Sequence, residues 1–170
     1  MDPSNTPAVV CDAGPLIHLD ELDCADLLSD FSHCIVAPAV WEEVSRHRPA
    51  VLARTDIPFS RPEVVPSPTP TVQALLHAFD LHPGEREALV LAATDPATLF
   101  LTDDTAARVA ASSLGITVHG SLGVLIRSVR RGLRSTEQVL ATLRAIPHRS
   151  TLHIRATLLD EVIATVAAQG

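Results

Sequence analysis

The 170-residue sequence contains no lysine and no tyrosine, and aromatic residues make up only 3% of it. So few aromatic side chains exclude a nucleic-acid platform on which several bases stack. The three cysteines, Cys11, Cys24 and Cys34, form no C-x-x-C pair, which argues against a disulfide framework and a zinc site. No apolar run approaches the roughly 20 residues of a membrane helix, and the N-terminus resembles no secretory signal. We therefore expect a cytoplasmic protein that does not contact a membrane.

The composition supplies ample material for a hydrophobic core. Hydrophobic residues make up 46% of the chain and charged residues 19%, so extended disorder is excluded. The segment 58–70 contains five prolines. Because proline lacks an N–H and fixes φ, this segment predicts an extended surface connection. We expect a single domain over residues 1–170, with helices in its C-terminal part, 135–170.

Short apolar runs alternate with helical patterns along the chain. Four runs predict strands, at residues 9–11, 34–37, 98–101 and 116–118. Periodicity and proline or glycine boundaries predict helices after residues 15 and 38, and at 71–80, 83–93, 106–114, 122–131, 136–145 and 156–168. Strands separated by helices form βαβ units, so the sequence predicts an α/β fold with a parallel sheet and helices on both faces.

Acidic side chains follow the predicted strands, at the edge where open parallel sheets hold their ligands. Asp12 follows the first strand, and Asp103 and Asp104 follow the third. Glu42 and Glu43 lie in the first turns of the helix after the second strand. Each acid alone also fits a turn, a helix cap or a solvated first turn. Because separate elements bring them to one edge, we interpret them together as a site.

A further carboxylate, Glu87, enters a helix whose body, residues 88–93, is apolar on every side. Burying a carboxylate in such surroundings is costly unless the group is paired or binds a metal ion. Glu87 is therefore a candidate member of the same site. Glu85, two residues earlier, fits an ordinary first-turn residue stabilised by the helix dipole.

The net charge of the chain is −7, and its charged residues are distributed unevenly along the sequence. Residues 1–104 contain 17 acids and 5 arginines, whereas residues 105–159 contain one acid and 8 arginines. A basic flank beside an acidic half is what a nuclease with a carboxylate metal site would show. Two interpretations are open for the four arginines at helical spacing in that flank, a solvated helix end or contacts with an RNA backbone. These residues are Arg127, Arg130, Arg131 and Arg134.

Five segments in succession resemble the PIN-domain family. They read V-V-C-D-A-G-P-L-I, P-A-V-W-E-E-V, P-G-E-R-E-A-L-V-L-A, F-L-T-D-D-T-A-A-R-V-A and H-G-S-L-G-V-L, and span about residues 9–133. The sequence is most similar to a nuclease branch related to VapC-type toxins. The resemblance implies a three-layer α/β/α sandwich with a central, mainly parallel sheet. It also implies cleavage of single-stranded RNA that depends on Mg²⁺ or Mn²⁺.

The resemblance assigns the acids residue by residue. The family's fourth acid falls on Asp104 if Thr102 matches the family's threonine, or on Asp103 if the pair is read from its first acid. Thr102 is then a candidate to hydrogen-bond a ligand or the phosphate. The third acid is glutamate here, where VapC toxins often have aspartate. The acids implied to be catalytic and to bind the metal are Asp12, Glu43, Glu87 and Asp104, with Asp103 as a further metal ligand.

The alternative functions differ in what they require. A receiver-like phosphoacceptor needs a lysine, which this chain lacks, and no P-loop or Ser-His-Asp arrangement is present. A non-catalytic PIN-like module that binds nucleic acid or protein stays open, because a fold does not fix an activity. Expected partners are single-stranded RNA, an antitoxin if the protein is a toxin, and a second copy in a homodimer.

Overall fold

The computed structural model describes residues 6–95 and 97–168; the other residues of the predicted 1–170 domain lie outside the described residues. Five strands form one fully parallel sheet in the order β3-β2-β1-β4-β5. They are β1 (Ala8–Cys11), β2 (His33–Val36), β3 (Phe59–Ser60), β4 (Leu99–Leu101) and β5 (Val118–His119). The predicted α/β class with a parallel sheet is confirmed.

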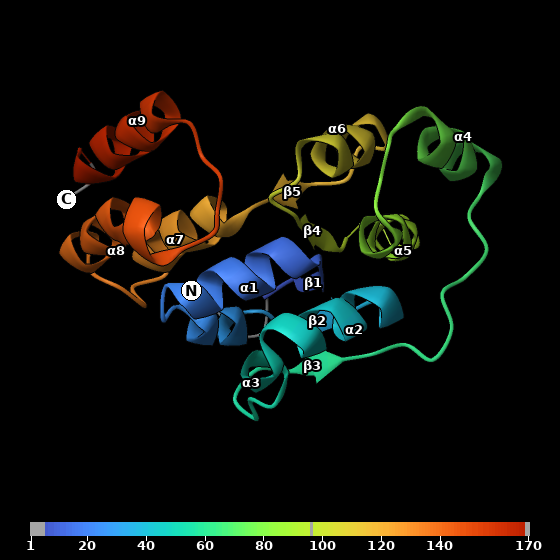
Figure 1. The fold of residues 1–170 in the computed structure, drawn as a ribbon, viewed down its shortest axis with the longest axis horizontal. Helices are drawn as coiled ribbons and strands as arrows, with labels where there is room; N and C mark the ends of the chain where they lie inside the picture. Colours follow the sequence, from blue (N-terminus) through green and yellow to red (C-terminus); the bar gives the residue numbers. More distant parts are fainter. Residues whose placement is uncertain (1–5, 96, 169–170) are drawn as a thin grey trace.

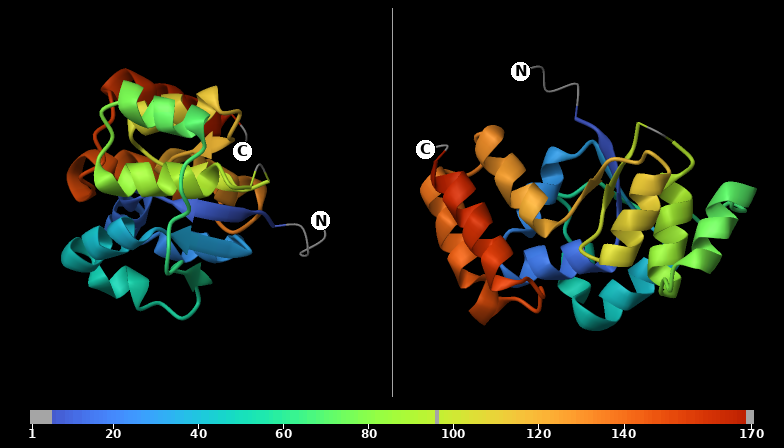
Figure 2. Two further views of the ribbon diagram at one scale, coloured as in Figure 1. Left: turned by 90° about the vertical axis from the view of Figure 1, so that its right-hand side faces the viewer. Right: turned by 90° about the horizontal axis from the view of Figure 1, so that it is seen from above.

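Helices cover both faces of the sheet (Figure 1). The helices before β4 are α1 (Ala13–Glu21), the 3₁₀ helix η2 (Ala25–Asp30), α2 (Pro38–His47), α3 (Pro49–Leu52), α4 (Pro70–Ala78) and α5 (Pro83–Ala92). Those after β4 are α6 (Thr105–Ser113), α7 (Ser121–Arg130), α8 (Thr136–Arg149) and α9 (Ala156–Ala167). Helices α1 and α7 lie on one side, with α4 and α5 on the other. Helices α8 and α9 pack side by side at one end of the molecule, far from α4 (Figure 2).

The core is centred on β1, the middle strand. Val9, Val10 and Cys11 are at most 1% exposed, because β1 pairs with β2 and β4 and carries helices on both faces. Such a strand reads as a continuous apolar run, which is how its sequence looks. Strands β1 and β4 end side by side, since Cys11 pairs with Leu101. The residues that follow these two strands therefore emerge together at one edge of the sheet.

Several elements of the fold differ from the sequence expectations. Phe59 and Ser60, at the start of the proline-rich segment, form the edge strand β3 beside β2. An edge strand tolerates neighbouring prolines because one side of its ladder needs no partner. Helix α8 extends to Arg149 through Pro147, beyond the predicted end at residue 145. The short helices η2 and α3 were not expected, because too few residues form them to show periodicity.

Candidate active site

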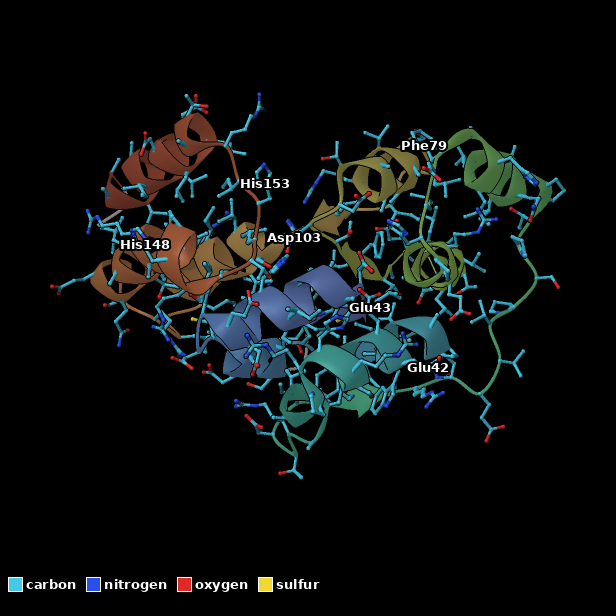
Figure 3. All side chains as sticks on the ribbon, in the orientation of Figure 1. Glu42, Glu43, Phe79, Asp103, His148 and His153 are labelled. Carbon is cyan, nitrogen blue, oxygen red and sulfur yellow. The ribbon has the colours of Figure 1, made fainter. Side chains whose placement is uncertain are left out.

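A cavity of about 720 Å³ opens at the edge where β1 and β4 end. It collects side chains from the start of α1, from α2, from the start of α5, from the β4–α6 turn and from the segment between α8 and α9. Figure 3 labels four of the lining residues, Glu42, Glu43, Asp103 and His153. The polar lining residues are Asp12, His18, Glu42, Glu43, Arg46, His47, His82, Glu85, Asp103, Asp104, Thr151 and His153.

Asp12 lies at the floor of the cavity and is 5% exposed. It is the N-cap of α1: Oδ1 accepts a hydrogen bond of 2.8 Å from the Ala13 N–H. Oδ2 accepts one of 2.8 Å from the hydroxyl of Thr102. Burial raises the pKa of Asp12 to about 6, with a smaller contribution from the charges of Glu85 and Glu43, although its two hydrogen bonds oppose the rise. The residue therefore serves as both a helix cap and a cavity carboxylate.

Glu85 takes a place in the cavity that the sequence did not predict. It lies in the first turn of α5, where its Oε2 accepts a 2.7 Å hydrogen bond from the His82 N–H. Burial raises the pKa of this carboxylate, and the charges of Asp104 and Glu43 raise it further. Asp12, Glu43, Glu85 and Asp104 are thus close enough to influence one another electrostatically.

Glu87 is not among the residues that line the cavity. Its Oε2 accepts a 2.8 Å hydrogen bond from the N–H of Ala39, in the first turn of α2. The N-cap of that helix is Ala37, whose side chain has no oxygen to accept from a free N–H. The carboxylate supplies this acceptor and complements the positive end of the helix dipole. Glu87 is therefore paired with the N-terminus of α2, which satisfies the need of a partly buried carboxylate for a partner.

The helical geometry of α5 explains why Glu85 faces the cavity and Glu87 does not. Successive helical residues turn by about 100°, so two residues apart they face nearly opposite directions. Because α5 begins at Pro83 beside the cavity, its first turn carries the side chain that points inward. The Pro83-Gly84 boundary was the available signal for this placement, since it locates the start of the helix.

Asp103 and Asp104 both line the cavity but have different partners. Asp104 is the N-cap of α6, and its Oδ1 accepts from the Ala107 N–H at 2.7 Å. Asp103 is 12% exposed and accepts from the Ser121 N–H at 2.8 Å, the Ser121 hydroxyl at 2.6 Å and His18 Nδ1 at 2.8 Å. These hydrogen bonds outweigh burial and lower the pKa of Asp103. Its carboxylate is committed to holding neighbouring side chains.

Thr102 is fully buried and donates to Asp12. Of the two roles expected for it, contact with a site carboxylate is the one that the structure shows. Direct contact with a phosphate is contradicted, because no part of the side chain reaches the surface. Thr102, which follows β4, thus positions Asp12, which follows the neighbouring strand β1.

Close packing around Asp103 predicts that Gly120→Ala destabilises the protein. An added Cβ would overlap Oδ1 of Asp103 and lie 2.9 Å from Nη2 of Arg108, so the free energy of unfolding should fall by about 2 kcal/mol. Gly14→Ala is the matched control, because its Cβ would approach Asp103 and His18 no closer than 3.5 Å. Urea denaturation measures the free energy of unfolding of both variants. Equal stability of the two variants would contradict the packing.

The arginines expected on one helix face have separate positions. Arg131 follows the end of α7, and Arg134 lies beyond Gly132, whose φ of 71° marks the end of the helix. Arg127 and Arg131 both form ion pairs with Asp30, at 2.7 and 3.0 Å. Arg134 pairs with Asp26 at 2.6 Å.

The structure contradicts the shared helix face, because α7 ends at Arg130, whereas contact of these arginines with an RNA backbone stays a prediction. Acids of η2, about 100 residues earlier in the chain, neutralise three of the four arginines. Arg130 is exposed and lines a second cavity of about 250 Å³, together with His119.

The first cavity contains the type of ligand atom that a divalent cation prefers. Carboxylate oxygens are the ligands that Mg²⁺ and Mn²⁺ prefer. Burial raises the pKa values of Asp12 and Glu85, and the charges of neighbouring carboxylates raise them further. Within residues 6–95 and 97–168, however, no three Asp, Glu, His or Cys side chains converge tightly enough to hold an ion as they stand. The structure therefore supports the type of ligand and leaves the coordination to be tested.

Comparison with known proteins identifies the family. The family model DUF3368, a PIN domain, matches residues 8–168, so the chain belongs to this family and has a nuclease-type fold. No curated protein and no solved structure matches the chain. The PIN-domain resemblance is confirmed, whereas the relation to VapC-type toxins stays a prediction. In the part of the chain that the structure describes, no helix is long and apolar enough to cross a membrane.

Proposed function

We propose that this PIN-domain protein is a metal-dependent ribonuclease that hydrolyses phosphodiester bonds of single-stranded RNA. The observation that carries the proposal is the carboxylate cavity at the ends of β1 and β4. Two of its acids have raised pKa values, partly because neighbouring carboxylates repel them. A protein retains such an unfavourable arrangement when a bound cation compensates it.

The residues that would hold the ion are Asp12, Glu43, Glu85 and Asp104. A bound Mg²⁺ or Mn²⁺ would supply activation of a water molecule and stabilisation of the charge on the phosphate. Glu85 replaces Glu87 in this set, since Glu87 lies outside the cavity. Thr102 holds Asp12 through its hydroxyl, and the backbone N–H of Ala107 fixes Asp104.

The rim of the cavity offers arginine and histidine side chains as hydrogen-bond donors for a nucleic-acid strand. Arg46 and His47 of α2 and His153 of the α8–α9 segment are exposed lining residues. Arg46 forms an ion pair of 3.7 Å with Glu42, but both side chains are more than 60% exposed. Such a surface pair is weak, so Arg46 is available to a phosphate.

Hydrolysis of a labelled single-stranded RNA with Mn²⁺, Mg²⁺ or EDTA tests the proposal. We expect products with either metal and none with EDTA, and slower cleavage of the same sequence in a duplex. Binding of the RNA without any product in Mn²⁺ would instead favour a non-catalytic PIN-like module. A toxin role needs a separate observation, which is growth arrest relieved by a small protein that co-purifies with this one.

The raised pKa of Asp12 predicts that metal binding weakens in acid. Mn²⁺ should raise the melting temperature by binding the folded state, and it needs Asp12 ionised. Because the pKa is about 6, the Mn²⁺ affinity should fall about tenfold per pH unit below 6 and level off above it. Melting curves with and without Mn²⁺ from pH 5 to 8 measure this. An affinity independent of pH in that range would contradict the assignment of Asp12.

A further inference from the structure

A hydrogen-bonded cluster of His18, Asp103 and Ser121 lies at one side of the cavity. His18 belongs to α1, Asp103 follows β4, and Ser121 begins α7. Asp103 Oδ2 lies 2.8 Å from His18 Nδ1 and 2.6 Å from the Ser121 hydroxyl. The imidazole is 15% exposed and lines the cavity. Three elements that are distant in the sequence thus fix the orientation of one histidine ring.

The cluster determines which hydrogen bond His18 can offer to a ligand. An ionised carboxylate only accepts hydrogen bonds, and Ser121 already donates to Asp103 from both its N–H and its hydroxyl. Nδ1 of His18 must therefore carry the hydrogen that points at Asp103. In the neutral imidazole the second nitrogen, Nε2, then keeps its lone pair and acts as an acceptor.

An acceptor in this position suits few groups of a nucleic-acid backbone. Phosphate oxygens and the ring and ester oxygens of the sugar are all acceptors, so none of them can donate a hydrogen bond to Nε2. The one hydrogen-bond donor in the backbone of single-stranded RNA is the ribose 2′-hydroxyl, which DNA lacks. With Nε2 as an acceptor, His18 is therefore complementary to RNA at a point where DNA leaves Nε2 unpaired.

We propose that Nε2 of His18 accepts a hydrogen bond from a ribose 2′-hydroxyl of the bound strand, and so contributes to the discrimination of RNA from DNA. The inference rests on the proposed nuclease function, because it needs a strand bound in the carboxylate cavity. His18 is a specificity-determining residue in this assignment, while Asp103 and Ser121 position its ring.

Binding measurements separate this role from a general loss of function. Fluorescence anisotropy at pH 8 with Ca²⁺ compares a short single-stranded RNA, the DNA of the same sequence, and RNAs with one 2′-deoxy position. In the wild type we expect one of the single 2′-deoxy positions to weaken binding about fivefold, the effect of one neutral hydrogen bond. The RNA should bind to His18→Ala about fivefold more weakly than to the wild type. The DNA should bind to both proteins with the same affinity.

The double change provides the sharpest evidence. If His18 and the 2′-hydroxyl contact each other, His18→Ala and the sensitive 2′-deoxy position together should weaken binding no more than either alone. His18→Gln, whose side-chain oxygen can accept a hydrogen bond, should retain part of the preference and guards against misfolding of the alanine variant. His153→Ala is the matched control, since this cavity histidine should affect RNA and DNA equally.

The outcomes distinguish the two proposals. If His18→Ala folds, as judged by its melting curve, and keeps the full preference for RNA, the role of His18 is wrong and the nuclease function is untouched. The same conclusion follows if the two changes weaken binding independently. If the wild type neither binds nor cleaves single-stranded RNA, the proposed function fails and the role of His18 fails with it.

Discussion

Replacing Asp12 by asparagine is expected to reduce metal-dependent RNA cleavage by about a thousandfold, which corresponds to about 4 kcal/mol of transition-state stabilisation. Asparagine keeps the shape of the side chain and is a good N-cap, so the start of α1 should be preserved. What it removes is the negative charge at the floor of the cavity. Single-turnover cleavage in Mn²⁺ measures the loss.

The same variant should be more stable than the wild type in EDTA. The folded-state pKa of Asp12, about 6, lies above the ordinary value of 3.8. Ionisation of this carboxylate therefore lowers the free energy of unfolding. This destabilisation is absent below pH 3.8, grows between pH 3.8 and 6, and is complete above pH 6. In Asp12→Asn the free energy of unfolding at pH 8 should rise by up to about 3 kcal/mol.

Urea denaturation in EDTA at pH 4 and pH 8 tests both the sign and the pH range. The advantage of Asp12→Asn should be small at pH 4 and large at pH 8. Full cleavage activity in this variant would remove Asp12 from the catalytic set. A loss of stability at pH 8 would show that its hydrogen bonds to Ala13 and Thr102 outweigh the cost of burying its charge.

Glu85 and Glu87 provide the second large contrast, because the same substitution at two nearby positions should have opposite consequences. Glu85→Ala removes a cavity carboxylate and should reduce cleavage by about a hundredfold or more. Its stability should change little, because relief of the repulsion from Asp104 and Glu43 offsets the lost hydrogen bond from the His82 N–H. Glu87→Ala leaves the Ala39 N–H without its acceptor. It should lower the free energy of unfolding by about 1 kcal/mol and leave most of the activity.

Measured together, the two variants control for each other. Cleavage rates in Mn²⁺ and urea denaturation of both proteins give the four numbers required. The reverse pattern, with activity lost at Glu87 and stability lost at neither residue, would restore Glu87 as a metal ligand. In that case the metal-bound protein would have to turn Glu87 away from the end of α2.

The order of strands and helices was accessible from the sequence because local patterns determine it. The predicted strand at residues 9–11 lies in β1, which ends directly before Asp12, and Gly115 separates α6 from β5, as the sequence indicated. Parallel pairing then places Asp12 beside the residues after β4, which follows from topology alone. The existence and location of the acidic cavity could be predicted from these elements.

The partners of individual side chains could not be predicted in this way. The acid of α5 that enters the cavity depends on the rotation of a helix about its axis, which the sequence pattern gives only approximately. The ion pairs of Arg127 and Arg131 depend on Asp30, about 100 residues earlier, in a 3₁₀ helix too short to show periodicity. His18 belongs to no motif, and its contact with Asp103 spans 85 residues.

The position of β1 at the centre of the sheet has a consequence for biosynthesis. Asp12 emerges early from the ribosome, but the groups that hold it in place, the Leu101 carbonyl and the Thr102 hydroxyl, are about 90 residues later in the chain. At 5–20 residues per second they follow after roughly 5 to 20 seconds. Until then β1 lacks one neighbouring strand, and Asp104, which follows β4, has not yet been made. The carboxylate cavity at the ends of β1 and β4 is thus incomplete until β4 and the residues after it have been translated.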